Sequence, residues 1–514
     1  MSSEERGPRR SGKAGQGRSG AGGGARRRPP IGRAGRPHPG RQGIGQRMRG
    51  ERMGGERTGG ERMGGERTDG ERMGGERTDG ERLGRGPLPT APDGVDATGH
   101  QVQRRSLSHQ GGAAELVGEP EIAARLAKAM AAPEGVDEDR LTHGFHTYPA
   151  RMHAAIARQC LQDFHPGVGA HVLDPFCGSG TVLLEARLQG LHAHGCDLNP
   201  LALRVAQVHC SPLQGPLRTQ FEEAVRLVAT NSEARVRQRV PIRARLPRAE
   251  VARYQPHVLL ELAGLYAEIG GIQEVPVRRV LEVVFSAMVV KFSRQRADTS
   301  DQLVEKRLRK GLVTEFFVRK THELLRRWQA VDQEMPQAPG RLHLVQGDAR
   351  RLPKTLGTKA PAMDLVLTSP PYGGTYDYVQ HHARRYPWLG LSPERFAEWE
   401  IGSRRALSAD PQGAARWDEE LGAALGAIGR CCRPGAQVVV LLGDAQVGGV
   451  RVDALVQLRR IAPQANMDLV AGVAQRRPDF RGGPSRREHL ICLTVREKPA
   501  KRDRPYSGGP AGTH

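Results

Sequence analysis

The stretch Asp174-Pro175-Phe176-Cys177-Gly178-Ser179-Gly180-Thr181 decides the fold, and it directly follows an apolar run at residues 171–173. The run predicts a buried strand, and the two glycines predict a turn from that strand into a helix over residues 182–189. A second strand is expected over residues 191–196, and a second helix over 200–209. This series of strand, glycine-rich turn, helix and strand is typical of parallel α/β sheets that bind nucleotides.

Acidic side chains stand where these two strands end. Asp174 ends the first strand, and Asp197-Leu198-Asn199 ends the second. An acid after the second strand can accept hydrogen bonds from ribose hydroxyls, and a glycine turn lets the backbone approach a ligand closely. The two features together predict a nucleoside site at the carboxyl edge of the sheet.

The α/β pattern continues on both sides of a long helical block. Further strands are expected at residues 342–346, 364–368, 437–442, 468–474 and 489–495, so the core should comprise residues 135–213 and 338–498. Helical periodicity fills the block at 214–337, with candidate helices near 216–230, 248–268, 276–292 and 312–333. We therefore predict a Rossmann-like α/β domain with a mostly parallel, twisted sheet and a helical insertion.

The N-terminal quarter has a different composition. The whole chain has 514 residues, a net charge of +22, 65 glycines and only 4% aromatic residues. Its first 47 residues hold Lys13 and eleven arginines, and residues 50–84 repeat Gly-Glu-Arg-(Met/Thr/Leu)-(Gly/Asp) seven times. A five-residue period fits neither a helix nor a strand, so residues 1–134 are expected to be disordered, as are residues 499–514. The repeat is either a translated DNA repeat without function or the linker of a basic nucleic-acid tether.

Several classes of protein are disfavoured. No stretch approaches the roughly 20 apolar residues of a membrane span, and the N-terminus lacks the apolar core of a signal peptide, which predicts a soluble, cytoplasmic protein. The seven cysteines form no Cys-x-x-Cys pair, which argues against a disulfide framework and a structural zinc site. His143 and His146 have no neighbouring acid or thiol to complete a metal site, so no metal is expected.

The segment from Asp174 to Thr181 resembles the Asp-Pro-Phe-x-Gly-Ser-Gly-Thr motif of S-adenosylmethionine-dependent methyltransferases that act on exocyclic amino groups of nucleic acids. The resemblance implies the class I methyltransferase fold and S-adenosyl-L-methionine as cofactor. The first acid and the glycines would hold the methionine part, Asp197 the ribose, and Asp348 the adenine, unless Asp348 is a turn or capping residue. Residues 143–152 resemble the segment that closes one side of this pocket. The implied cofactor residues are Tyr148, Pro149, Asp174, Phe176, Gly178, Gly180, Thr181, Asp197, Asn199 and Asp348.

Ser369-Pro370-Pro371-Tyr372 follows the apolar strand at 364–368 and resembles the catalytic motif of the same family. Ser369 and the carbonyl of Pro370 would accept the two N–H bonds of an amino group, while the prolines keep that carbonyl rigid and Tyr372 stacks on the base. Positioning against a sulfonium methyl group would then carry much of the rate. This role requires Ser369 to face the glycines at 178 and 180 across a short gap.

Two further observations concern the target base. The chain has no Pro-Cys step, which argues against methylation at carbon 5 of cytosine. Residues 373–379, rich in glycine and tyrosine, are either a loop that folds over a flipped base or an ordinary loop. Trp388, Trp399 and Trp417 downstream are expected to be packing anchors.

The insertion is basic, with 22 Lys and Arg against 15 acids over residues 214–335. Seven arginines lie within residues 235–253 beside a single acid, Glu250, and arginine at this density suits contact with phosphates. The alternative is an ordinary arginine-rich surface. The expected nucleic-acid contacts are Arg235, Arg237, Arg239, Arg243, Arg245, Lys291, Arg294 and Arg296.

These features predict an S-adenosylmethionine-dependent DNA methyltransferase. Ser instead of Asp at position 369 favours N4 of cytosine over N6 of adenine as the acceptor. An RNA guanine-N2 methyltransferase is the first alternative, because those enzymes share the core and a related Pro-Pro-Tyr motif. The second is a nucleic-acid-binding protein without catalytic activity, which would be expected to have lost a motif residue.

Overall fold

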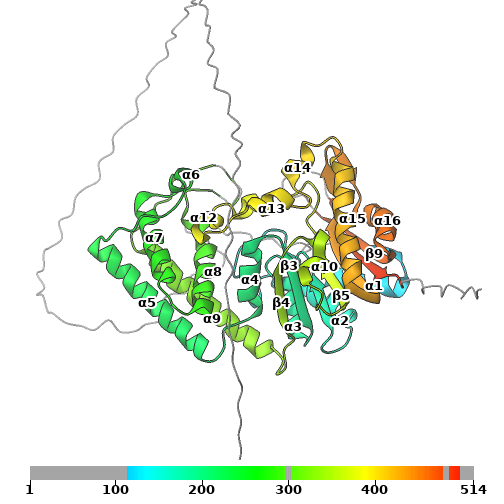
Figure 1. Ribbon diagram of the computed structural model, residues 1–514, viewed down its shortest axis with the longest axis horizontal. Coiled ribbons are helices and arrows are strands. Elements are labelled where there is room, and N and C mark those ends of the chain that lie inside the picture. The colour runs from blue at the N-terminus through cyan, green and yellow to red at the C-terminus, as the bar shows by residue number, and fades with distance from the viewer. Residues whose placement is uncertain (1–112, 297, 299, 301, 478–485, 498–514) are drawn as a thin grey trace, which may run out of the picture. The chain divides into compact units, whose positions relative to one another are not determined.

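The computed structural model describes residues 113–296, 298, 300, 302–477 and 486–497. Residues 1–112 and 499–514, which the sequence predicts to be disordered, lie outside the described residues. The strands of the main sheet are β1 (Glu115–Gly118), β2 (His171–Asp174), β3 (His192–Asp197), β4 (Leu342–Gln346), β5 (Met363–Thr368), β6 (Cys432–Gly443), β9 (Met467–Arg477) and β10 (Arg486–Val495). Their order across the sheet is β1-β9-β10-β6-β5-β2-β3-β4 (Figure 1).

The centre of the sheet is parallel. β2 pairs with β3 on one side and with β5 on the other, and β4 and β6 extend the parallel region outward. β10 runs antiparallel to both β6 and β9, and β1 runs antiparallel to β9. The chain therefore proceeds from β2 to one edge and then returns to start again beside β2, as in doubly wound nucleotide-binding folds. The predicted Rossmann-like, mostly parallel fold is confirmed.

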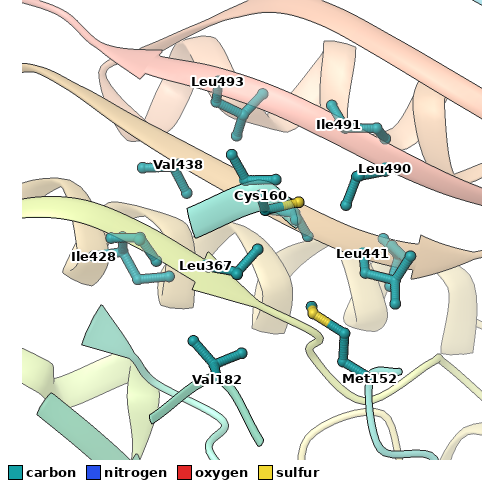
Figure 2. Packing of buried hydrophobic residues seen from close by; sticks show 14 of the residues in the cluster. Met152, Cys160, Val182, Leu367, Ile428, Val438, Leu441, Leu490, Ile491 and Leu493 are labelled. Carbon is teal, nitrogen blue, oxygen red and sulfur yellow. The ribbon is translucent and has the colours of Figure 1, made fainter. Parts of the chain in front are cut away.

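Two series of helices flank this sheet. One consists of α1 (Pro120–Ala131), α2 (Ala154–Asp163), α3 (Thr181–Leu188) and α4 (Pro200–Cys210), each of which packs on the next. The other consists of α10 (Leu352–Leu356), α15 (Gly413–Cys431) and α16 (Ala454–Ile461). Right-handed crossovers that proceed in opposite directions from β2 place the two series on opposite faces. Figure 2 shows Leu367 of β5 and Val438 of β6 in the core with Cys160 of α2 and Ile428 of α15.

The prediction that residues 1–134 are disordered is wrong for residues 113–134. β1 adds a strand beyond β9, and α1 buries Ile122, Leu126 and Met130 in the main core. These three residues recur every four positions, which is the spacing of one helix face. Burial of this face against α2 and β9 explains why the segment is ordered.

The block at 214–337 is helical and connects β3 to β4. Its helices are α5 (Pro216–Gln238), α6 (Arg248–Val251), α7 (Pro256–Gly270), α8 (Val275–Phe292) and α9 (Leu312–Glu334). The single helix expected at 248–268 is divided into α6 and α7, because Pro256 has no N–H for a continuous helix and instead begins α7. These helices enclose a second core, which Leu201 of α4 and Trp388 also enter. In Figure 1 the green helices of this block lie together beside α4.

Short elements follow β5 and β6. Between β5 and α15 lie α11 (Tyr378–His382), α12 (Arg385–Leu389), α13 (Glu394–Trp399) and α14 (Arg404–Ser408). We call residues 373–408 the post-catalytic segment. The short strands β7 (Ala445–Val447) and β8 (Val450–Val452) form a separate antiparallel pair. None of the helices in the described part of the chain combines the length and apolarity that a membrane span requires.

Candidate active site

The site lies where the strand order reverses, between β2 and β5. Their carboxyl ends bring Asp174 and Thr368 together, and the Thr368 hydroxyl donates a 2.7 Å hydrogen bond to the Asp174 carboxylate. The backbone N–H of Phe176 donates a second bond to the same carboxylate, at 3.1 Å. Burial raises the pKa of Asp174 to about 7, although both hydrogen bonds favour the charged form. A cationic ligand group at this point would stabilise the carboxylate further.

The two glycines of the turn are required for different reasons. Gly178 has φ +48°, and a Cβ there would lie 2.9 Å from the Tyr148 ring. Gly180 has φ +87°, and a Cβ there would lie 2.9 Å from the Cys210 sulfur of α4. The missing side chain at Gly178 therefore leaves room for the Tyr148 ring. At Gly180 the missing side chain allows close packing between α3 and α4. Gly180 does not line the cavity, and the expected ligand contact there stays a prediction.

Asp197 ties the end of β3 to the glycine turn. Its carboxylate accepts the N–H of Gly178 at 2.9 Å and that of Asn199 at 2.8 Å. Burial raises the pKa of Asp197 to about 6, against the effect of these bonds. Asn199 is fully buried, and its side-chain oxygen caps α4 through the N–H of Leu201 at 3.0 Å. The predicted cofactor contact at Asn199 is therefore not supported, because its oxygen satisfies the helix start.

Asp348, after β4, is a capping residue that also lines the pocket. It caps a short 3₁₀ turn by accepting the N–H of Arg350 at 2.9 Å, and both of its oxygens lie 3.0 Å from the Arg350 guanidinium. It also lines the same pocket as Asp174 and Asp197. Three acids from three adjacent parallel strands thus border one cavity.

The pocket collects most of the residues predicted from the sequence. Of the expected cofactor residues, it is lined by Tyr148, Pro149, Asp174, Phe176, Gly178, Thr181, Asp197 and Asp348, and of the catalytic motif by Ser369 and Pro371. Ser369 is half-buried and lines the same cavity as Gly178, whereas Gly180 does not line it. The side chain of Pro370 is buried beside it and does not line the cavity.

Tyr372 is placed differently from the prediction. It is 8% exposed, does not line the pocket, and donates its hydroxyl to Glu488 of β10 at 2.7 Å. A Cβ at Gly443 would lie 2.6 Å from its ring, so the ring packs on the end of β6. Tyr372 therefore anchors the catalytic motif to the sheet, and the structure provides no support for its stacking on a base.

The glycines after Tyr372 also serve packing. A Cβ at Gly373 would lie 2.8 Å from the indole nitrogen of Trp417, and one at Gly374 would lie 2.6 Å from the carbonyl oxygen of Gln446. Trp417 is buried, as expected for a packing anchor. The turn is thus shaped by α15 and β7, which hold the start of the post-catalytic segment.

The sequence did not indicate that the post-catalytic segment forms one wall of the pocket. Tyr378, Phe396, Trp399, Glu400 and Ile401 line it. Glu400 accepts the N–H of Tyr378 at 2.7 Å, and burial raises the pKa of Glu400 to about 7. Asp377 in turn accepts the N–H of Arg405 at 3.0 Å, together with the Arg404 side chain. These reciprocal contacts fix two stretches that lie more than twenty residues apart in the sequence.

Buried polar side chains hold residues 143–152, which precede α2, in place. His143 Nε2 lies 2.8 Å from the buried carboxylate of Glu185 on α3, which Arg158 also contacts. His146 bonds to the hydroxyl of Ser286 at 2.9 Å. Both histidines thus have structural partners, and Glu185 connects the segment that carries Tyr148 to the helix that follows the glycine turn.

The residues present fit S-adenosylmethionine. Thr181 begins α3, and its hydroxyl is buried without a hydrogen-bond partner among the described residues. The N-terminus of a helix and a free hydroxyl suit a carboxylate, such as that of the methionine part. Asp174 offers a partner for the ammonium group, Asp197 for the ribose and Asp348 for the adenine. Two observations support this fit. The Thr181 hydroxyl has no partner among the described residues, and the missing side chain at Gly178 leaves space beside Tyr148.

The arginines predicted to bind nucleic acid fall into two groups. Arg235 is ion-paired with Glu268, while Lys291 lies over the Phe316 ring and Arg296 contacts Gln302. Arg294 is half-buried beside the backbone of Arg253. In contrast, four arginines are exposed and have no ion pair with any described residue, namely Arg237, Arg239, Arg243 and Arg245.

Residues 145–249 match the family model of the RMKL-like, methyltransferase domain. They include the glycine turn, Asp174 and Asp197 but not Asp348. This stretch is similar to that methyltransferase domain. The predicted resemblance to S-adenosylmethionine-dependent methyltransferases of nucleic acids is thereby confirmed, and S-adenosylmethionine is the cofactor of that class.

Two curated relatives match short stretches of the chain. The chain is 36% identical over 77 residues to the type II methyltransferase M.MvaI of Kocuria varians, which is 14% of this chain and 17% of the relative. It is 33% identical over 66 residues to the type II methyltransferase M.MjaII of Methanocaldococcus jannaschii, which is 13% of this chain and 12% of the relative. The matches thus span less than a fifth of either relative.

Solved structures with a related arrangement include TrmN from Thermus thermophilus, with 13% identity, a TM-score of 0.26 and coverage of 66% of this chain and 48% of that one. The rRNA methyltransferase aviRa from Streptomyces viridochromogenes has 13% identity, a TM-score of 0.28 and coverage of 70% and 94%. The strand order of the methyltransferase domain, and not these low similarities, identifies its fold.

Proposed function

We propose that the protein transfers a methyl group from S-adenosylmethionine to an exocyclic amino nitrogen in DNA, with N4 of cytosine favoured over N6 of adenine. The observation that supports this proposal is the shared cavity of Ser369 and Gly178 at the carboxyl ends of adjacent strands. The proposal would have been excluded if Ser369 and the glycine turn lay at opposite edges of the sheet. Serine at the first motif position supports cytosine.

The chemistry assigned to the chain is positioning. When bound, S-adenosylmethionine supplies a methyl group on a positively charged sulfur. The Ser369 hydroxyl and the Pro370 carbonyl accept hydrogen bonds from the two N–H groups of the target amino group, so that the nitrogen lone pair points into the cavity. Asp174, Gly178 and Thr181 would hold the cofactor so that its methyl group could pass to this nitrogen, with the sulfur as leaving group and one amino proton lost to water.

The exposed arginines of the insertion are assigned to the nucleic-acid backbone. Arg243 and Arg245 alternate with Ile242, Ala244 and Leu246, which pack against the second core. The alternating burial of residues 242–246 places Arg243 and Arg245 on the exposed side of this stretch. Arginines that have no acidic partner among the described residues are available for phosphates, whereas the ion-paired Arg235 is not.

The test uses the purified full-length protein and cofactor carrying a labelled methyl group. Duplex DNA, single-stranded DNA and tRNA are incubated separately and then digested for nucleoside analysis. Label in N4-methylcytosine from DNA is expected. Label in N6-methyladenine would change the assigned base, and label confined to RNA guanosine would replace DNA by the RNA alternative. Cofactor binding without transfer to any of the three substrates would support the non-catalytic alternative.

A further inference from the structure

The end of α13 contributes an aromatic wall to the pocket. Phe396 and Trp399 both line it, although they belong to the post-catalytic segment and not to the strand ends. Among the four tryptophans, Trp328, Trp388 and Trp417 are at most 4% exposed, as packing residues should be. Trp399 is only half-buried. Its expected role as a packing anchor is therefore not what the structure shows.

Trp399 lies at the Asp348 end of the pocket. The Arg350 guanidinium that contacts both Asp348 oxygens also donates to the carbonyl oxygen of Trp399 at 3.0 Å. The neighbouring Arg351 places its guanidinium carbon 4.4 Å from the centre of the indole ring. Residues 348–351, directly after β4, therefore include the acid expected near adenine and the two arginines that contact the backbone and ring of Trp399.

Adenine is flat and uncharged, and most of its surface favours contact with flat, weakly polar side chains. Asp348 can contact only the polar edge of the ring, and its carboxylate is already partly engaged by Arg350. We propose that Trp399, with Phe396 beside it, is a further cofactor-binding residue that packs against the adenine ring. The proposal rests on the assignment of S-adenosylmethionine to this pocket and adds a contact from outside the core motifs.

The test measures binding of S-adenosylhomocysteine to the full-length protein by calorimetry. Trp399→Ala is expected to weaken binding by about tenfold, which is within the range for loss of one base–aromatic contact. Trp399→Phe should retain most of the affinity. Glu398→Ala is the matched control, because Glu398 is exposed on the same helix and does not line the pocket. Methylthioadenosine, which keeps the adenosine but lacks the amino-acid part, should show the same loss with Trp399→Ala.

Wild-type affinity in Trp399→Ala would overturn the proposal. If this variant does not fold, Trp399→Phe provides a separate measurement, since ligand binding should quench part of the wild-type tryptophan fluorescence and that part should vanish in the variant. Equal quenching in both proteins would also overturn it. If the wild-type protein binds no S-adenosylhomocysteine, the cofactor assignment itself fails, and this outcome is distinguishable from the failure of Trp399 alone.

Discussion

Thr368 donates its hydroxyl to the buried carboxylate of Asp174 at 2.7 Å. The bond joins the last residue of β5, directly before Ser369, to the acid that opens the cofactor motif. Because it favours the charged carboxylate, it opposes the effect of burial, which raises the pKa of Asp174 to about 7. The protonation state of Asp174 thus depends on the last residue of β5.

Thr368→Val is expected to raise the pKa of Asp174 further and to shift the pH dependence of cofactor affinity upward. Asp174 must be charged to attract the ammonium group of the cofactor, so wild-type affinity should increase as the pH rises through about 7. Calorimetry with S-adenosylhomocysteine between about pH 6 and pH 9 measures this profile. Thr368→Ser keeps the hydroxyl and serves as control. Superimposable profiles for Thr368→Val and the wild type would contradict the prediction.

Ser369→Ala should reduce turnover by roughly a hundredfold, which is typical for loss of one positioned hydrogen-bonding group. Affinity for S-adenosylhomocysteine should change little, because the cofactor contacts lie on other residues. Single-turnover transfer of labelled methyl to the preferred nucleic acid, together with calorimetry, separates the two effects. A large loss of cofactor affinity would mean that Ser369 has been assigned to the wrong part of the pocket.

Joint replacement of Arg243 and Arg245 by alanine should weaken nucleic-acid binding and reduce its salt dependence. Each lost phosphate contact lowers the slope of log affinity against log salt by about one unit. Fluorescence anisotropy with a labelled oligonucleotide at several salt concentrations measures both quantities. Arg309→Ala is the matched control, because Arg309 is exposed in the same insertion but ion-paired with Glu315. The assignment fails if the control and the double variant have equal slopes.

The free energy of unfolding should fall as the pH drops from about 6.5 toward 4. His171, His192, His194 and His343 lie in contact on neighbouring strands, with ring centres 5.0 to 5.7 Å apart. Burial, with the neighbouring histidines, lowers the pKa of His194 to about 4. Between about pH 6.5 and pH 4, His194 is therefore protonated in the unfolded chain but not in the folded one. Its contribution to the free energy of unfolding is complete above about pH 6.5 and is lost as the pH falls toward 4.

Urea unfolding at several pH values measures this loss, to which His194 contributes up to about 3 kcal/mol. His194→Gln should reduce the slope of stability against pH. The slope should not vanish, because burial also holds the pKa values of His146 and His209 well below the ordinary range. His322→Gln, at an exposed position, should leave the slope unchanged. An unaltered slope in His194→Gln would show that the histidine cluster does not limit stability in acid.

The sequence predicted the central strands and the acids at their ends because both signals are local. An apolar run followed by an acid and glycines has the same meaning wherever its partners lie. β1 and α1 were missed because their order depends on β9, which lies about 350 residues later in the chain. The spacing of Ile122, Leu126 and Met130 was the available signal, but the polar composition of the preceding residues obscured it.

The pocket wall from the post-catalytic segment could not be predicted for a different reason. Helices of five or six residues, such as α11 and α13, are too short to show a periodic pattern. Their positions depend on the contacts of Asp377 and Glu400 with residues far along the segment. The contact of Tyr372 with Glu488 could not be predicted, because nothing in the motif indicates Glu488 as a hydrogen-bond partner.

Because Arg350 links Asp348 to the end of α13, we expect binding of the methyl donor and of its target to influence each other. The same segment carries Tyr378, which borders the cavity beside Ser369. If binding of the methyl donor orders α13, the entropic cost of this ordering is not incurred again when the target binds. By thermodynamic linkage, target binding must then strengthen donor binding by the same factor. Methyl donor and target are then expected to be held most tightly as a ternary complex, and each product should loosen the other when it departs.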